Sequence, residues 1–89
     1  MRGNMAPVER LSVIIPVYNE ARTVALLIRR VRAVPLDLEI LAVNDASTDG
    51  SGDLLEQLHH EGVVDIVIHH TKNRGTGAAI RTGIQHAGG

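Results

Sequence analysis

The chain has 89 residues, with nine Lys and Arg, ten Asp and Glu, and a formal net charge of −1. A chain of this length forms one small domain that buries about 63% of its extended surface. The balanced charge offers no electrostatic surface to nucleic acid or an anionic membrane, and a single aromatic residue excludes proteins that stack bases on aromatic side chains. The lack of Cys excludes disulfides and Cys-zinc sites and fits a reducing compartment.

The first predicted unit is a strand followed by a helix. Residues 1–10 are expected to be a leader and the start of the domain, and they lack the apolar segment of a secretory signal. Residues 11–15 are rich in β-branched side chains and precede Pro16, which predicts a strand. A helix is then predicted from Asn19, as its N-cap, to a stop before Pro35. Its apolar positions are Val24, Leu27, Ile28 and Val31.

Two further strand and helix units follow, with predicted strands at 38–43 and 63–68. The second helix ends at Gly62. The apolar stripe of the second helix is Leu54, Leu55 and Leu58, and that of the third is Thr76, Ile80, Gly83, Ile84 and Ala87. Because the strands are apolar enough to be covered on both faces, this βαβαβα order predicts a three-layer α/β fold around a parallel sheet with right-handed connections.

The loops after the three predicted strands are polar, and ligands of open parallel sheets bind beyond the carboxyl ends of the strands. Asp45 follows a buried strand and comes too early to cap the next helix, which favours a carboxylate that accepts hydrogen bonds from a nucleobase or ribose. Glu20 fits the same role or that of a partner for the helix dipole. Lys72, Arg74 and Gly75 precede the third helix, a combination that suits an anion.

Other polar residues near these loops have structural interpretations. Ser47, Thr48 and Asp49 precede an apolar helix, which is typical of helix capping. The arginines at 29, 30 and 32 are expected on the solvent face of the first helix. The His pairs at 59–60 and 69–70 suggest metal ligands, but adjacent side chains point in different directions, so no metal site is predicted.

Two common nucleotide-binding motifs do not match. A dinucleotide fingerprint needs G-x-G-x-x-G after the first strand, whereas Gly75 and Gly77 follow the third, and Ile80 stands where the last glycine belongs. No glycine precedes a Lys, so the Walker A motif is also absent from the sequence. Both a dinucleotide fold and a P-loop NTPase are therefore disfavoured.

Three segments, LSVIIPVYNEARTV, EILAVNDASTDGS and HHTKNRGTGAAIRTGIQHA, together resemble the amino-terminal part of the family 2 glycosyltransferases. The resemblance runs from Leu11 to the end and is greatest to enzymes that move a sugar from a nucleotide to a polyprenyl phosphate, such as dolichol-phosphate mannose synthases. It implies half of a GT-A (Rossmann-like) nucleotide-sugar-binding domain with strand order 3-2-1. The implied nucleotide-sugar site consists of Pro16, Tyr18, Glu20, Val43, Asp45, Lys72, Arg74 and Gly75.

One departure from the family pattern lies next to the residue expected to bond the base. The family often has two Asp and then Gly after its second strand, where this chain has Asn44, Asp45 and Ala46. The position of Asp45 is kept, whereas Ala46 is expected either to hold a negative φ or to be mildly strained.

The resemblance also implies residues outside this sequence. The family holds its divalent metal with an Asp-x-Asp motif after a fourth strand, so Mg²⁺ or Mn²⁺ is expected in a full-length parent and no tight metal binding is expected here. Residues 11–89 are accordingly expected to be a truncated domain without catalytic residues. Its first strand would form an uncovered edge of the sheet.

The sequence thus predicts part of a transferase that moves a sugar from a UDP- or GDP-linked donor to a polyprenyl phosphate or glycan, inactive on its own. The alternative is a non-catalytic nucleotide-binding or interaction module that a partner chain completes; a CheY-like phosphoacceptor lacks its acidic cluster and late Lys. No apolar run approaches the roughly 18 residues that cross a bilayer. A cytoplasmic protein is expected, with membrane association only through the parent.

Overall fold

The computed structural model describes residues 10–88 and shows three parallel strands that alternate with three helices. The strands are β1 (Leu11–Val17), β2 (Leu38–Asn44) and β3 (Ile66–His69). The helices are α1 (Val24–Arg32), α2 (Ser51–His60) and α3 (Thr76–His86). The leader expected at residues 1–10 lies outside the described residues except for Arg10.

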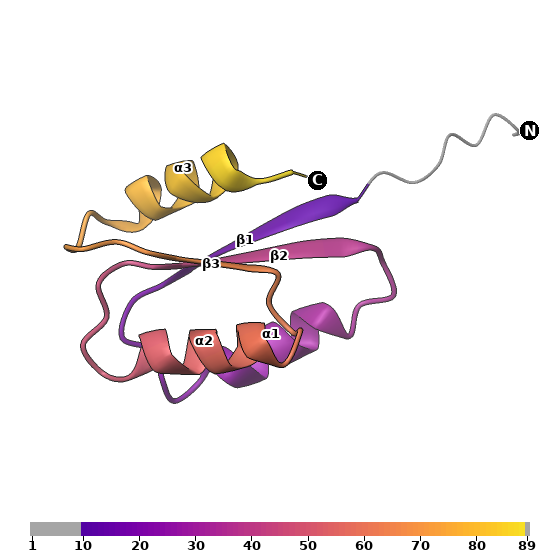
Figure 1. Ribbon diagram of the computed structural model, residues 1–89, viewed down its shortest axis with the longest axis horizontal. Helices are drawn as coiled ribbons and strands as arrows, with labels where there is room; N and C mark the ends of the chain where they lie inside the picture. Colours follow the sequence, from indigo (N-terminus) through magenta and orange to yellow (C-terminus); the bar gives the residue numbers. More distant parts are fainter. Residues whose placement is uncertain (1–9, 89) are drawn as a thin grey trace, which may run out of the picture.

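The sheet has the order β1-β2-β3, with α1 and α2 on one face and α3 on the other (Figure 1). This arrangement confirms the predicted three-layer α/β fold and the predicted strand order. Within residues 10–88, β1 lies at an edge of the sheet, as expected.

The central strand β2 carries the core. All seven of its residues are buried because helices cover both of its faces. On the α1 and α2 side, Ile40 packs in one cluster with Ile28 and Leu55, and all three are fully buried. The parallel register pairs Val17 with Asn44, and Asn44 with His69, so the carboxyl ends of the strands lie level.

β3 begins later than predicted. Val63 and Val64 donate backbone hydrogen bonds to the carbonyl of Leu58, which makes them part of the turn after α2 rather than of the sheet. Val64 is nevertheless buried in the core. The apolar run at 63–68 therefore correctly indicates buried residues, but only its second half pairs with β2.

The prediction that Asn19 caps the first helix is wrong. α1 begins at Val24, and Asn19 has a left-handed backbone with φ of 51°. Its side-chain Oδ1 accepts a hydrogen bond from the Thr48 N–H (2.8 Å) instead of from the start of α1. Asn tolerates this conformation better than most residues, and here it joins two loops.

The buried face of α3 also differs from the prediction. Ile80 and Ile84 are 39% and 60% exposed, whereas Ala78, Ala79 and Gly83 are buried. α3 packs against β1 and β2 through these small residues. Of the predicted stripe, Gly83 is buried as expected, whereas the two isoleucines are exposed, because close contact with a sheet requires small side chains.

Replacing Gly83 by Ala is expected to destabilise the fold. The added Cβ would lie 2.5 Å from Cγ2 of Ile14 in β1, too close for any side chain. The overlap outweighs the gain in helix propensity, so we expect a loss of about 1–2 kcal/mol in the free energy of unfolding, measured with urea. Gly77→Ala, whose Cβ would make only an ordinary contact with Arg81, is the control and should be neutral or stabilising.

Arg32 does not lie on the solvent face as predicted. Its side chain is 31% exposed, and its guanidinium donates to the carbonyls of Val63 (3.0 Å) and Leu38 (3.1 Å). It also donates to Oδ2 of Asp65 at 2.6 Å. Arg32 thus joins α1 to the amino-terminal ends of β2 and β3.

Candidate nucleotide-sugar site

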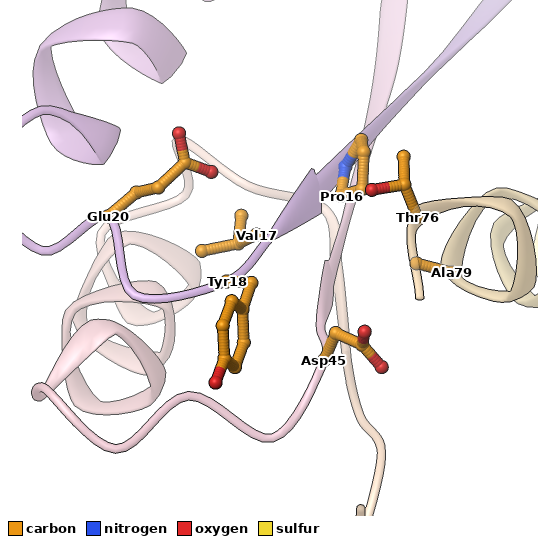
Figure 2. A pocket seen from close by; sticks show the side chains of 7 residues that line it. All are labelled: Pro16, Val17, Tyr18, Glu20, Asp45, Thr76 and Ala79. Atoms are coloured by element: carbon orange, nitrogen blue, oxygen red, sulfur yellow. The ribbon is translucent and has the colours of Figure 1, made fainter. Parts of the chain in front are cut away.

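A pocket of about 210 Å³ lies at the carboxyl ends of β1 and β2, against the start of α3 (Figure 2). Its lining residues are Pro16, Val17, Tyr18, Glu20, Asp45, Thr76 and Ala79. In Figure 2 the Asp45 carboxylate points away from Tyr18. Four residues that the sequence indicated, Pro16, Tyr18, Glu20 and Asp45, therefore share one pocket.

The other four predicted residues do not line this pocket. Val43, the second-to-last residue of β2, is fully buried. Lys72 and Arg74 are exposed on the loop between β3 and α3, and Gly75 immediately precedes that helix. Arg74 and Gly75 contact the pocket indirectly, through backbone N–H groups bonded to Asp45.

Three lining residues were not predicted. Val17 extends β1 beyond Pro16, which the sequence had placed after the strand. Thr76 and Ala79 lie in the first turn of α3 and reach the pocket because α3 packs its small residues on the sheet. The alanines at 78 and 79, beside two glycines, were the available signal for that face.

The carboxylate of Asp45 is buried and accepts three hydrogen bonds. Its Oδ1 accepts from His70 Nδ1 (2.8 Å) and from the Arg74 N–H (2.9 Å), and its Oδ2 accepts from the Gly75 N–H (2.8 Å). Burial alone would raise the pKa of Asp45, but these bonds and the nearby imidazole outweigh it and lower the pKa. The pocket therefore contains a fixed carboxylate that remains ionised at neutral pH.

Ala46, directly after Asp45, has a φ of 63°. The sequence expected either a negative φ or mild strain at this position, and the positive value corresponds to strain. A left-handed non-glycine residue costs about 1–2 kcal/mol. The chain therefore turns sharply beside the buried carboxylate at an energetic cost that glycine would avoid.

Hydrogen bonds join the loop after β1 to the loop after β2. The Asn19 N–H donates to Ser47 Oγ, and the Glu20 N–H donates to Ser51 Oγ, each at 3.0 Å. Asp49 accepts from the Ala21 N–H and from the Ser51 N–H. These bonds fix the backbone that carries Tyr18 and Glu20. The N-cap of α2 is Gly50, so the prediction that Ser47, Thr48 or Asp49 is the cap is wrong.

Comparison with known proteins identifies the family. Residues 12–89 match glycosyl transferase family 2. The chain belongs to this family. It is 37% identical to proteins of Salmonella paratyphi A and Salmonella dublin that are named undecaprenyl-phosphate 4-deoxy-4-formamido-L-arabinose transferase. The similarity covers 94% of this chain and 27% of each relative, so the chain spans about a quarter of the length of these glycosyltransferases.

Two solved structures share the fold of this chain. The mannosyltransferase PcManGT from Pyrobaculum calidifontis, solved with GDP-Man and Mn²⁺, matches with a TM-score of 0.76 and 28% identity over 89% of this chain and 24% of its own. TarS from S. aureus matches with a TM-score of 0.78 and 23% identity over 91% of this chain and 15% of its own. The fold is therefore the GT-A type that the resemblance implied.

Residues 10–88 do not provide a donor set for a divalent metal. Among them no group of three or more His, Asp, Glu or Cys side chains could hold an ion. His69 contacts Glu56 (2.6 Å) and Asn44 (2.9 Å), and His70 contacts Asp45, so the paired histidines have separate partners. Mg²⁺ and Mn²⁺ prefer several oxygen ligands, and the described residues do not gather them.

No helix in the described part of the chain is long and apolar enough to span a membrane.

Acid is expected to destabilise this domain. The pKa values of Asp45 and Asp65 lie below the usual value, despite burial, because each carboxylate accepts hydrogen bonds from backbone N–H groups and basic side chains. A lowered pKa means that the unfolded chain binds more protons, so the stabilisation is complete above about pH 5 and is lost as pH falls below about 4. Urea unfolding at about pH 7 and about pH 3.5 should show the loss. The stability of Asp45→Asn should depend less on pH than that of the wild type. An equal pH dependence in the two proteins would show that Asp45 does not contribute to the acid sensitivity.

Proposed function

We propose that this chain forms the nucleotide-binding part of a glycosyltransferase that moves a sugar from a UDP- or GDP-linked donor to a polyprenyl phosphate or glycan. The observation that carries the proposal is the pocket at the strand ends, which is lined in part by the buried, ionised Asp45. The family supports the reaction type, and the names of the Salmonella relatives support a lipid-phosphate acceptor. The GDP-Man complex of PcManGT supports the donor class.

The carboxylate of Asp45 has one hydrogen-bond acceptor site left for a ligand. A carboxylate has about four acceptor sites, and the loop and His70 occupy three of them. The remaining site, on Oδ2, can accept from an N–H group of the base. The hydroxyl of Tyr18 and the carboxylate of Glu20 are exposed at the same pocket and suit ribose hydroxyls.

The size of the pocket indicates that it encloses only part of the nucleotide-sugar donor. At about 210 Å³ it is smaller than the 300–1,000 Å³ of typical ligand sites, and it suits a base and ribose rather than a complete nucleotide-sugar. We propose that Lys72, Arg74 and the amino-terminal end of α3 attract the diphosphate. In the longer glycosyltransferase, Mg²⁺ or Mn²⁺ would neutralise the leaving diphosphate. A cytoplasmic location fits a chain without Cys.

A second candidate is an interaction module that completes its sheet along β1. It is favoured by the position of β1 at an edge of the sheet within residues 10–88. Nucleotide binding distinguishes the two candidates, because an interaction module does not need the ionised carboxylate in the pocket.

Isothermal titration of this chain with UDP, GDP and ADP tests the proposal. We expect saturable millimolar binding of UDP or GDP, because only part of the donor is enclosed, and weaker binding of ADP. Added Mn²⁺ should leave the affinity unchanged, since the described residues gather no metal ligands. Equal affinity for all three nucleotides, or no binding at all, would contradict the proposal.

A further inference from the structure

A buried histidine connects three elements around the pocket. His70 follows β3, and its side chain is only 6% exposed. Its Nδ1 lies 2.8 Å from Oδ1 of Asp45, and its Nε2 lies 2.8 Å from Oγ1 of Thr82 in α3. Its backbone N–H donates to the carbonyl of Asn44 at 2.8 Å. Both the ring and the backbone of His70 are therefore held in place.

The two partners of the His70 ring, Asp45 and Thr82, determine which ring nitrogen donates a hydrogen bond. An ionised carboxylate only accepts hydrogen bonds, so Nδ1 of His70 carries the proton that lies between it and Asp45. The Thr82 hydroxyl can either donate to Nε2 or accept from it. The chain of groups Asp45, His70 and Thr82 is therefore satisfied throughout, which is a requirement for buried polar groups.

This chain of groups joins the walls of the pocket. Asp45 comes from the end of β2, and the Arg74 and Gly75 N–H groups that share its carboxylate come from the loop before α3. Thr82 lies in α3, the same helix that brings Thr76 to the pocket. A shift of the His70 ring would release a donor from Oδ1 and loosen the contact between loop and carboxylate.

We propose that His70 is a positioning residue that fixes the Asp45 carboxylate and the loop at residues 71–75 for nucleotide binding. The inference rests on the proposed function. His70 saturates Oδ1 together with Arg74, which leaves Oδ2 as the oxygen that meets the base. It acts through Asp45 and does not itself line the pocket.

Matched variants separate this role from general stability. An Asn amide at position 70 places a donor near Nδ1, whereas a Gln amide places one near Nε2. His70→Asn should therefore keep the bond to Asp45, and His70→Gln and His70→Ala should lose it. The readouts are the amide exchange rates of Arg74 and Gly75 by NMR and the affinity for UDP and GDP by titration.

We expect His70→Ala and His70→Gln to bind nucleotide about tenfold more weakly and to exchange the two amides about tenfold faster, while His70→Asn stays close to the wild type. Circular dichroism controls for folding. Equal affinity and equal exchange in His70→Ala and the wild type would overturn the positioning role. So would a loss in His70→Asn as large as in His70→Gln. If the wild type binds no nucleotide, the proposed function fails, and the positioning of a nucleotide ligand fails with it.

Discussion

Asp45→Ala is expected to abolish measurable binding of UDP and GDP and to lower the free energy of unfolding by about 3 kcal/mol. The substitution removes the ligand carboxylate and leaves three donors, on His70, Arg74 and Gly75, without their acceptor. A buried donor left unpaired costs about 1–3 kcal/mol, and partial access of water reduces the sum. Titration calorimetry measures the affinity, and urea unfolding measures the stability.

Asp45→Asn separates the two effects. The amide keeps one acceptor oxygen but places an NH₂ group where a carboxylate oxygen accepted hydrogen bonds, so we expect a stability loss of about half that of Asp45→Ala, with binding still weak. If Asp45→Ala binds nucleotide as tightly as the wild type, Asp45 serves only to hold the loop, and the proposed contact with the base is wrong.

Arg32→Ala is expected to lower the free energy of unfolding by about 2 kcal/mol without changing nucleotide affinity. It leaves two backbone carbonyls without their guanidinium partner, at the end of the sheet opposite the pocket. The Asp65 carboxylate loses its 2.6 Å bond to Arg32 and keeps the Ile40 N–H and the longer contact with Arg10 (3.5 Å). Because the guanidinium is partly exposed, water replaces some of these bonds, which keeps the loss below the 3–5 kcal/mol of a fully buried pair. Urea unfolding and nucleotide titration measure the two quantities.

Arg30→Ala is the matched control for Arg32→Ala. Arg30 is two residues away on the same helix and is exposed to solvent, so its loss should change the stability by less than about 0.5 kcal/mol. Equal stability of the two variants would show that the Arg32 hydrogen bonds contribute nothing beyond a charge on α1.

Much of the fold follows from local patterns in the sequence. Apolar β-branched runs that end just before Pro16, Asn44 and His69 indicated three strands covered on both faces, and the structure confirms a parallel sheet. Helix faces were less predictable, because α3 packs through Ala79 and Gly83 rather than through its isoleucines. Which side of a helix meets a sheet depends on the distance between the two, and hydrophobicity alone does not record that distance.

The candidate site could be predicted only in part, because some of its residues are placed by strand pairing rather than by a local sequence pattern. Acidic residues in the loops after two of the predicted strands indicated Glu20 and Asp45, since parallel strands end at the same edge of a sheet. His70 was interpreted only as one of two adjacent histidines, and no local pattern tells which of them is buried. The register of β3 against β2 decides that: it turns His69 toward solvent and leaves the side chain of His70 against Asp45.

The most direct test of the account is to map the nucleotide on the chain by NMR. On addition of UDP or GDP, we expect the amide signals of Tyr18, Glu20, Asp45, Gly75 and Thr76 to shift together in a saturable way. Those of Leu11, Leu36 and Val63, at the opposite ends of the strands, should remain in place. Saturable shifts confined to that opposite end, or to the outer surfaces of α1 and α2, would contradict the assignment of the pocket as the nucleotide site.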